Sequence, residues 1–390
     1  MTSFLFTLWS DLLDRAHAVR DGWAQFWFSP ADPLMLGVLR IGTGLVLLWV
    51  ILATGRMLPT MYGPDAWIDQ ETARILREQT PYIPPLPTWE PTGPDDRPGI
   101  VYQPELNQGP GVDDYSRRWN IWPGYAYSMG QLQFSPYFHL KTSPGLWTTH
   151  VLSLIIVVLF TAGVWTRVTS VLAWIVALAY IHRVSSALFG MDTMMALLLL
   201  YLMIGPSGDS LSFDRLWTNR QRKIAGLPIL DRPEPSEMAG VALRLLQVHF
   251  ALIYFAAGTS KLQGPSWWNG TAIWQTLANY EFTPERFPGY TAMLRLLAEN
   301  RWGWELFHTG GTLFTLFLEL GFPFLVWYRS WRWFCVLCAL ALHTGISITM
   351  GLHSFSVLMG LIALSFTDPA WLRSWFVKQL PESVVEPATT

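Results

Sequence analysis

The residues with the greatest potential for chemistry are polar side chains inside long apolar stretches. One run of small and polar residues ends at Lys261 and follows alternating steps of four and three, so its members share one face of a helix. A lysine amine on such a face can serve as a general base where burial and neighbouring cations disfavour its protonation. The members of this stripe are Gly240, Arg244, Gln247, Ala251, Tyr254, Gly258 and Lys261.

A second polar stripe has the same spacing and consists of His308, Thr312, Thr315 and Glu319. The two stripes can meet inside a helical bundle. We expect Lys261 to line an enclosed cavity with His182, Arg183, Tyr254 and His308, in which Gly258 leaves room for a flat ring one turn below. The alternative is structural, because small residues and threonine also let helices pack closely in lipid.

Ionisable residues within apolar stretches are costly and therefore mark candidate sites. If the N-terminus is cytoplasmic, most of them fall in the outer half of the membrane, which predicts a polar chamber open to the outer face. The alternative is that some snorkel to the interface. The residues of the outer half are His150, His182, Arg183, Asp192, Lys261, His308 and His343, with His353 at the outer start of the last span.

Three ionisable residues lie in the inner half: Arg40, Arg244 and Glu319. Counting residues from the inner ends of their spans gives Arg40 and Glu319 compatible depths. We therefore expect a structural ion pair or shared polar network between these two side chains. The alternative partner of Glu319 is Arg244.

The elements that must hold these residues are membrane helices. Of 390 residues, 51% are apolar, 14% are charged and the net charge is -2, which excludes a disordered chain and a nucleic-acid binder. The apolar residues gather in blocks of the length that crosses about 30 Å of hydrocarbon. The sequence thus predicts an all-α, polytopic membrane bundle with about eight spans: Leu34–Thr54, Leu146–Trp165, Val168–Leu188, Met191–Pro206, Ala239–Leu262, Leu306–Tyr328, Trp331–Met350 and Leu352–Phe366.

Three regions follow from this pattern. Residues 1–33 have the composition of an amphipathic helix in the membrane interface, or of a soluble helix folded onto the domain. Residues 34–370 form the transmembrane domain, with a long outer loop at 55–145, and residues 371–390 form a C-terminal cytoplasmic tail.

The distribution of Lys and Arg predicts the orientation. With the N-terminus inside, twelve of them lie in inner segments and ten in outer ones, but seven of those ten are in the long loop, which translocates regardless of charge. Both termini are therefore expected in the cytoplasm of a multi-pass inner membrane protein, of bacterial type.

The two cysteines, Cys335 and Cys338, share one helical face. They lie near the cytoplasmic end of a span, without the helix N-terminus that activates a thiol, which favours buried apolar packing over a redox pair. We expect no metal site. A third possibility is haem held by two histidines at one depth, for which His182, His308 and His343 are the candidates.

Several segments resemble one membrane family. They are Arg40-Ile41-Gly42-Thr43-Gly44, Tyr62-Gly63-Pro64-Asp65-Ala66-Trp67, the segment from Tyr254 to Leu262 followed by Trp267-Trp268-Asn269-Gly270, and His308-Thr309-Gly310-Gly311. Over roughly residues 30–375 the chain is similar to the horizontally transferred transmembrane (HTTM) domain, the membrane part of vitamin K-dependent gamma-carboxylase.

The resemblance implies a function and roles for residues. It places Lys261 at the position of the general base that deprotonates vitamin K hydroquinone, and His182 nearest to a second catalytic histidine. It implies a carbon–carbon lyase of carboxylase type, with quinol contacts expected from Arg183, Tyr254, Gly258, His308 and His343. Ser260 stands where the carboxylase has a second lysine, and the large lumenal domain that holds its protein substrate is absent.

Two functions therefore compete. The first is quinol-dependent carboxylase or oxygenase chemistry at an outward-facing chamber, with vitamin K hydroquinone or another quinol as cofactor and Lys261 as base. The alternative is a non-catalytic bundle that binds a lipid or a quinone, in which Lys261 is a snorkelling anchor. The expected partners are the lipid bilayer and a quinone, with no nucleic acid and a protein substrate that is unknown.

Overall fold

A computed structural model of the chain describes a helical protein with one pair of very short strands. The described residues are 2–70, 73, 89–91, 98–100, 135–184, 188–230, 232–279 and 289–377. Most of the loop predicted at 55–145, and the tail from 378 to 390, lie outside them.

The helices before residue 230 are α1 (Thr2–Phe28), α2 (Leu34–Gly55), α3 (Leu58–Tyr62), η2 (Pro136–Phe138), α7 (Ser143–Ala162), α8 (Thr166–Arg183), α9 (Gly190–Ile204) and α10 (Phe213–Ile224). Those after it are α11 (Glu237–Lys261), α12 (Pro265–Trp268), α13 (Ala272–Ala278), α14 (Tyr290–Glu299), α15 (Arg301–Gly303), η5 (Trp304–Thr309), α16 (Gly310–Leu325), α17 (Arg329–Met350), α18 (His353–Leu364) and α19 (Pro369–Val377). Strands β1 (Trp89–Pro91) and β2 (Pro98–Ile100) pair antiparallel.

The all-α prediction is confirmed, and each predicted span coincides with a helix or with two consecutive ones. Among the described residues, four helices are long and apolar enough to cross a membrane: α2, α7, α11 and α17. Helices α9 and α18 are shorter apolar helices. The full set of eight crossings stays a prediction.

The chain divides into two compact units. Unit 1 comprises residues 1–53, 151–177 and 188–390, and unit 2 comprises residues 54–150 and 178–187. We describe each unit by itself.

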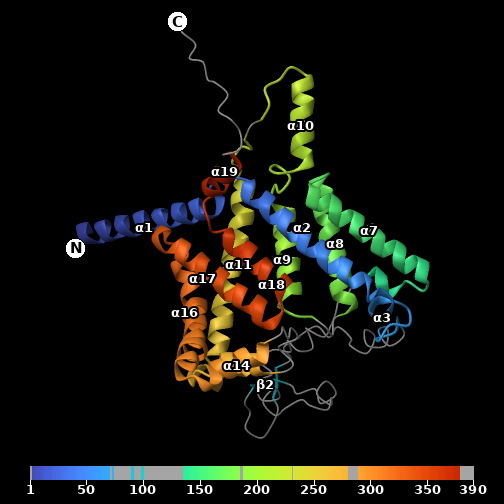
Figure 1. Ribbon diagram of the computed structural model, residues 1–390. Helices are drawn as coiled ribbons and strands as arrows, with labels where there is room; N and C mark the ends of the chain where they lie inside the picture. The colour runs from blue at the N-terminus through green and yellow to red at the C-terminus, as the bar shows by residue number, and fades with distance from the viewer. Residues whose placement is uncertain are drawn as a thin grey trace. The chain divides into compact units, whose positions relative to one another are not determined.

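Unit 1 is built around α11, which packs most extensively on α16, while α17 packs on α18 (Figure 1). The aromatic core of this bundle joins two helices, because Phe250 and Tyr254 of α11 lie against Phe322 of α16, with ring centroids 5.5 and 4.7 Å away. Such tilted and edge-on ring pairs stabilise more than their buried area alone. This packing fixes the face of α11 that carries Tyr254 and Lys261.

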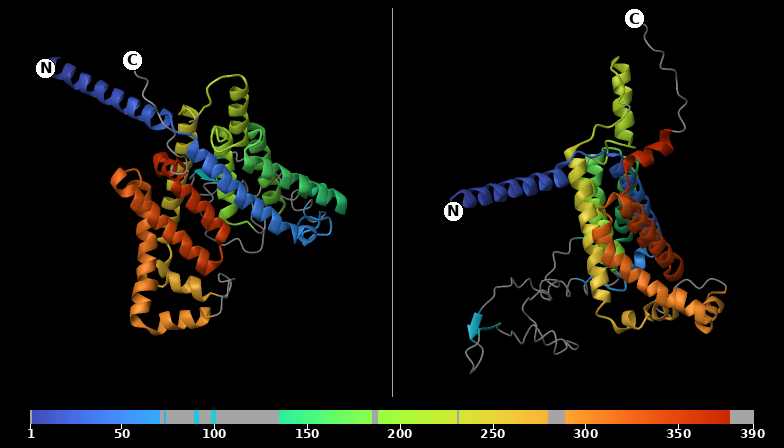
Figure 2. Two further views of the ribbon diagram at one scale, coloured as in Figure 1. Left: turned by 45° about the horizontal axis from the view of Figure 1, so that its top comes forward. Right: turned by 90° about the vertical axis from the view of Figure 1, so that its left-hand side faces the viewer.

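Two contacts bring distant parts of unit 1 together at one end. The backbones of Ala31 and Ser236 exchange hydrogen bonds of 3.0 Å, which joins the start of α2 to the start of α11. The Arg373 guanidinium in α19 pairs with the carboxylate of Asp32. Helix α10 lies at this same end and α14 at the opposite end (Figure 2).

Helix α1 confirms that residues 2–28 are helical, but most of it stands away from the rest of unit 1 (Figures 1 and 2). Its C-terminal end packs on the bundle, where the Phe26 ring lies 5.4 Å from that of Trp327 and receives the Arg244 guanidinium at 4.9 Å. Exposed Val19 and Trp23 precede this contact. Apolar side chains on an otherwise uncovered helix are typical of a segment in the membrane interface.

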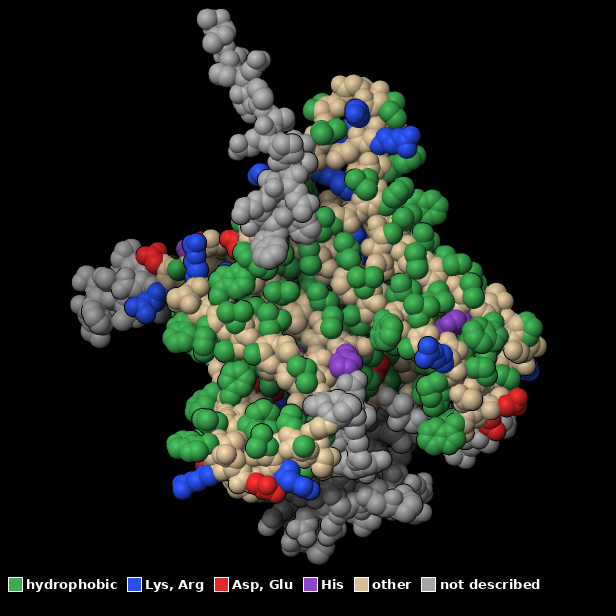
Figure 3. All heavy atoms as spheres, viewed as in Figure 1, with side chains coloured by type: hydrophobic (Ala, Val, Ile, Leu, Met, Phe, Trp, Pro, Cys, Tyr) green, Lys and Arg blue, Asp and Glu red, His purple; other side chains and the backbone are tan. Residues whose placement is uncertain are grey.

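The face of unit 1 seen in Figure 3 separates apolar from charged side chains. Figure 3 shows hydrophobic side chains over α17 and α18, with Lys and Arg gathered on α10 and further charged residues beside α14. The exposed apolar residues include Leu337 and Ile348 of α17 and Val357 of α18. Exposed apolar side chains between two charged ends are the arrangement that a bilayer favours.

Unit 2 contains a buried hydrogen-bonded chain of aromatic residues. Tyr137 donates to the Tyr180 hydroxyl at 2.7 Å, and that hydroxyl lies 2.7 Å from Nδ1 of His150. The Tyr62 ring meets the rings of Tyr137 and Tyr180 edge-on. Of the hydrogen-bonded residues, only His150 is a candidate from sequence, because Tyr137 and Tyr180 come from separate segments and carry no motif.

Candidate functional site

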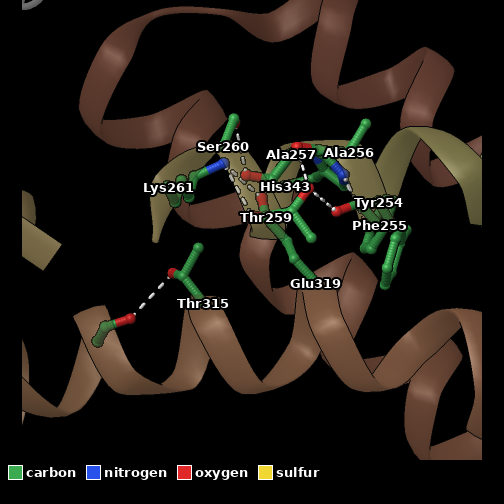
Figure 4. Close-up of polar contacts among 11 residues, drawn as sticks. Tyr254, Phe255, Ala256, Ala257, Thr259, Ser260, Lys261, Thr315, Glu319 and His343 are labelled. Atoms are coloured by element: carbon green, nitrogen blue, oxygen red, sulfur yellow. Dashed lines mark hydrogen bonds and ion pairs between the residues drawn. The ribbon is translucent and has the colours of Figure 1, made fainter. Parts of the chain in front are cut away.

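The centre of the candidate site is an ion pair between the last residue of α11 and the middle of α16. Lys261 Nζ lies 2.8 Å from Oε1 and 2.8 Å from Oε2 of Glu319, and it donates its hydrogen bond to Oε1 (Figure 4). The side chains are 25% and 10% exposed. A carboxylate this close stabilises the protonated amine, so the two charges hold each other inside the bundle.

Next to this pair, Tyr254 of α11 contacts His343 of α17. The Tyr254 hydroxyl lies 2.9 Å from Nε2 of His343, and both side chains are buried (Figure 4). Phe322, three residues after Glu319 on α16, packs on the Tyr254 ring at 4.7 Å, so Tyr254 lies against the face of α16 that carries Glu319. The structure therefore brings four titratable side chains from three helices into one polar cluster: Tyr254, Lys261, Glu319 and His343.

The predicted place for a flat ring beside Gly258 is wrong. A Cβ on Gly258 would lie 2.9 Å from Cδ2 of Leu320 and 3.2 Å from Cβ of Glu319, so α16 fills that space. The glycine instead lets α11 and α16 approach closely, as small residues do between membrane helices. This close approach is what allows Lys261 to reach Glu319.

The contacts of the Lys261 amine in the described part of the chain are with an anion and an aromatic ring, not with the cations that we expected around it. The nearest charged group is the Glu319 carboxylate, and the face of the Trp267 ring lies 5.4 Å from Nζ. An anion and an aromatic face both attract a cation. A proton acceptor at this site must consequently be the pair and not the amine alone.

His308 lies in η5, at the opposite end of the polar stripe from Glu319. Its side chain is fully buried among the rings of Trp274, Trp304 and Phe307, with centroids 5.2, 4.8 and 5.4 Å away. Neither ring nitrogen has a hydrogen-bond partner among the described residues. The whole predicted stripe of His308, Thr312, Thr315 and Glu319 is buried.

The expected pair between Arg40 and Glu319 does not form, and neither does the alternative with Arg244. The fully buried Arg40 donates to the carbonyl oxygens of Ser207 at 2.5 Å and Leu211 at 2.6 Å, in the turn before α10. Arg244 donates to Gln247 at 3.0 Å. Counting residues from the end of a span predicts how deep a side chain lies in the membrane. It does not predict which neighbouring helix or turn the side chain faces, so it cannot distinguish these partners.

His182 and Arg183 belong to unit 2, whereas Lys261 belongs to unit 1. Within unit 2, Arg183 is buried and donates to the carbonyl oxygen of Ile68 at 2.7 Å. That His182 and Arg183 share a cavity with Lys261 stays a prediction. The catalytic role expected of His182 and the quinol contact expected of Arg183 stay predictions as well.

No metal centre is apparent in the described ranges. No group of three or more His, Cys, Asp or Glu side chains there is placed to hold a metal ion. Cys335 and Cys338 are free thiols, the first buried and the second partly buried.

The fold and site define a helical bundle, with helices suited to a membrane, around a partly buried Lys–Glu ion pair. No family model matches the sequence. The chain is similar to an uncharacterized protein, YitO, of Bacillus subtilis (strain 168), with 25% identity over 221 residues, which are 55% of this chain. The matched part spans 64% of that protein's length. No solved structure matches the chain.

Proposed function

We propose that this protein is a multi-pass membrane protein with an acid–base site that deprotonates a quinol, with Lys261 as the base. The observation that carries the proposal is the contact of 2.8 Å between Lys261 and Glu319. It gives the amine a partner that can take a proton from it. Without such a partner, an ammonium cannot accept a substrate proton.

The pair permits a proton transfer in which charge is conserved. Lys261 Nζ passes one of its protons to Glu319 and takes the proton of the substrate hydroxyl in its place. Glu319 becomes a neutral carboxylic acid, and the Lys261 ammonium remains beside the oxygen that lost its proton. An ammonium in a water-poor site stabilises such an oxyanion strongly.

The residues present fit a quinol in their chemistry. A quinol supplies an acidic hydroxyl and two reducing equivalents. Lys261 offers an amine that is one-quarter exposed, Trp267 offers a flat aromatic face 5.4 Å from Nζ, and the Tyr254 hydroxyl is a further hydrogen-bonding group on the same face of α11. Flat apolar walls with few polar groups are typical of sites for small organic molecules.

The resemblance to vitamin K-dependent gamma-carboxylase names the reaction type within this proposal. A carbon–carbon lyase of that type would use the deprotonated quinol with oxygen, and vitamin K hydroquinone is one candidate for the quinol. Ser260 stands where the carboxylase has a second lysine, and this separates the chain from the carboxylase. The acceptor of any carboxyl group is accordingly not part of the proposal.

A second candidate function is a non-catalytic bundle that binds a lipid or a quinone. The completeness of the ion pair favours it, because Lys261 and Glu319 satisfy each other without a ligand. Leu320, packed where a ring was expected beside Gly258, points the same way. The two functions differ in whether the amine of Lys261 exchanges protons with a substrate.

We further propose that the chain crosses an inner membrane eight times with both termini in the cytoplasm. The contacts of Ala31 with Ser236 and of Asp32 with Arg373 support this topology, because they join the segments before the first and fifth spans and after the last. All three segments are inner ones in the predicted orientation. Ser236 and Arg373 lie on the same side of the membrane only if the chain crosses it an even number of times between them, as the four predicted spans in that part of the chain do.

Labelling of introduced cysteines tests the topology. In a background with Cys335 and Cys338 replaced by alanine, Lys223→Cys should react only with a reagent that enters the cytoplasm, since α10 belongs to an inner segment. Arg295→Cys in α14 should react with an impermeant reagent added outside. Both side chains are exposed, so reactivity reports their side of the membrane. Labelling of the two positions from the same side would overturn the proposed topology.

Small molecules retained in mild detergent test the ligand. We expect mass spectrometry to find a quinone with the purified wild-type protein and at least about 10-fold less with Lys261→Ala, because each lost charged hydrogen bond costs about 1.5–3 kcal/mol of binding. Lys223→Ala, an exposed lysine on α10, is the matched control and should retain the wild-type amount. Equal retention in all three proteins would exclude Lys261 from the binding site.

A further inference from the structure

The buried polar stripe on η5 and α16 contains one imidazole, that of His308, whose ring nitrogens have no hydrogen-bond partner among the described residues. His308, Thr312, Thr315 and Glu319 follow one another at steps of four, three and four, and all four side chains are buried. Thr312 donates to the His308 carbonyl at 2.7 Å and Thr315 to the Gly311 carbonyl at 2.9 Å, so each hydroxyl oxygen keeps capacity to accept. Buried polar groups in an apolar helix are costly unless something hydrogen-bonds to them.

His308 gives a second, independent indication. Its side chain is 0% exposed, and neither Nδ1 nor Nε2 has a partner among the described residues. A neutral imidazole has one donor and one acceptor, and leaving either unsatisfied in a buried site costs free energy. The rings of Trp274, Trp304 and Phe307 enclose it, so the missing partner must be small, as water is.

The local backbone also departs from a regular helix at this point. Residues Trp304–Thr309 form a π-helix that continues into α16 through Gly310 and Gly311. Such π turns in a helix are rare and occur often at functional sites, because they displace side chains and loosen backbone hydrogen bonds. Here the π turn sets the position of His308 at the outer end of the stripe.

The spacing of the stripe suits a relay through single waters. Side chains three and four residues apart on a helix are about 5–6 Å apart. One water with two hydrogen bonds of about 2.8 Å bridges that distance. From His308 to Glu319 the stripe covers about 16 Å of helix axis, which three such bridges span in the order His308, Thr312, Thr315 and Glu319.

We propose that His308 is the outer terminus of a hydrated proton relay that connects the Lys261–Glu319 pair to the outer end of the bundle. The inference rests on the proposed function for its purpose, which is to remove the proton that Glu319 receives. That proton leaves the carboxyl group along the stripe, one imidazole nitrogen of His308 accepts it, and the other nitrogen releases its own proton outward. Neither His308 nor the threonines change their net protonation in a full cycle.

The test follows proton exchange at Lys261 and needs no substrate. The chain has four lysines, Lys141, Lys223, Lys261 and Lys378, so protein labelled with ¹⁵N at the lysine side chain gives few ammonium signals to assign. Lys261→Arg identifies the signal of Lys261. The measured quantity is the rate at which its ammonium protons exchange with water in the full-length protein.

We expect His308→Gln to slow the exchange at Lys261 by at least about 10-fold, because glutamine keeps hydrogen-bonding capacity but cannot take up a proton. Thr312→Val should slow it in the same direction, and Thr312→Ser should restore the wild-type rate. His353→Gln replaces an exposed histidine outside the stripe and should leave the rate unchanged. The thermal unfolding temperature of each variant reports whether it is folded.

An unchanged exchange rate at Lys261 in both His308→Gln and Thr312→Val would overturn the relay. Slowing by Thr312→Val and Thr312→Ser alike would also contradict it, since the hydroxyl would then be irrelevant. Because no quinol is present, these outcomes are distinct from failure of the proposed function. That failure would appear as loss of quinone retention or turnover while the exchange behaviour of Lys261 stays as predicted.

Discussion

Replacement of Arg40 by methionine is expected to destabilise the protein by about 3 kcal/mol or more. The guanidinium donates to the carbonyl oxygens of Ser207 and Leu211 from a fully buried position. Each buried carbonyl left without a donor costs about 1–3 kcal/mol, and a hydrogen bond from a charged group is worth more than a neutral one. The expected result is a lower thermal unfolding temperature of the purified protein in detergent.

The turns that Arg40 holds explain why the loss should spread beyond one residue. Gly163, with a φ of 73°, packs against the guanidinium, and Asp214 accepts hydrogen bonds from the backbone nitrogens of Trp165 and Thr166 at 2.8 and 2.7 Å. Arg40 thus stabilises the connection between α7 and α8 together with the turn before α10.

A matched comparison uses Arg244→Met. This arginine is also inside unit 1, but it donates one side-chain hydrogen bond, to Gln247, and otherwise lies against aromatic rings. We expect Arg244→Met to lower the free energy of unfolding by about 1–2 kcal/mol, because it removes one hydrogen bond and one cation–π contact. An Arg40→Met variant as stable as Arg244→Met would contradict the structural role assigned to Arg40.

Removal of the Lys261 amine is expected to have the largest effect on activity. General acid–base catalysis contributes about 10²–10⁴-fold, so Lys261→Ala should lower quinol turnover by that factor. The change also leaves the Glu319 carboxylate buried without its counter-ion, which costs about 3–5 kcal/mol if the group stays ionised. Activity and unfolding temperature must therefore be measured on the same preparation.

The double variant separates the two effects. In Lys261→Ala combined with Glu319→Ala, no buried charge is left unpaired, so the unfolding temperature should recover part of what Lys261→Ala loses. Quinol turnover should stay at the level of Lys261→Ala. Recovery of turnover together with stability would mean that Lys261 acts only through the fold.

Much of the bundle could be predicted because hydrocarbon imposes simple rules on sequence. Apolar stretches such as those around Leu47 and Val336 have the length of a membrane helix, and both became helices. The steps of four and three correctly predicted that Tyr254 and Gly258 of α11, and His308 to Glu319 of η5 and α16, face the interior. Helical periodicity fixes a face before any partner is known.

The partners were harder to predict, because periodicity does not say which helix lies opposite. Depth alone predicts Glu319 as the partner of Arg40, but Arg40 reaches carbonyl oxygens of a turn, and backbone acceptors leave no mark in a sequence. The pairing of Lys261 with Glu319 is predictable in principle, because each of the two residues is the last member of its polar stripe. Depth counting hides it, because it places Lys261 in the outer half of the membrane and Glu319 in the inner half, whereas the two side chains meet in the structure.

The most direct test of the central claim is hydroquinone-dependent oxygen uptake by the wild-type protein, Lys261→Arg and Lys261→Ala in lipid nanodiscs. Arginine keeps the positive charge but cannot give up its proton, so both variants should lose the activity by about 10²-fold or more if the amine of Lys261 is a base. Retention of the wild-type rate in Lys261→Arg, or equal rates in all three proteins, would contradict the account and leave Lys261 with a structural role only.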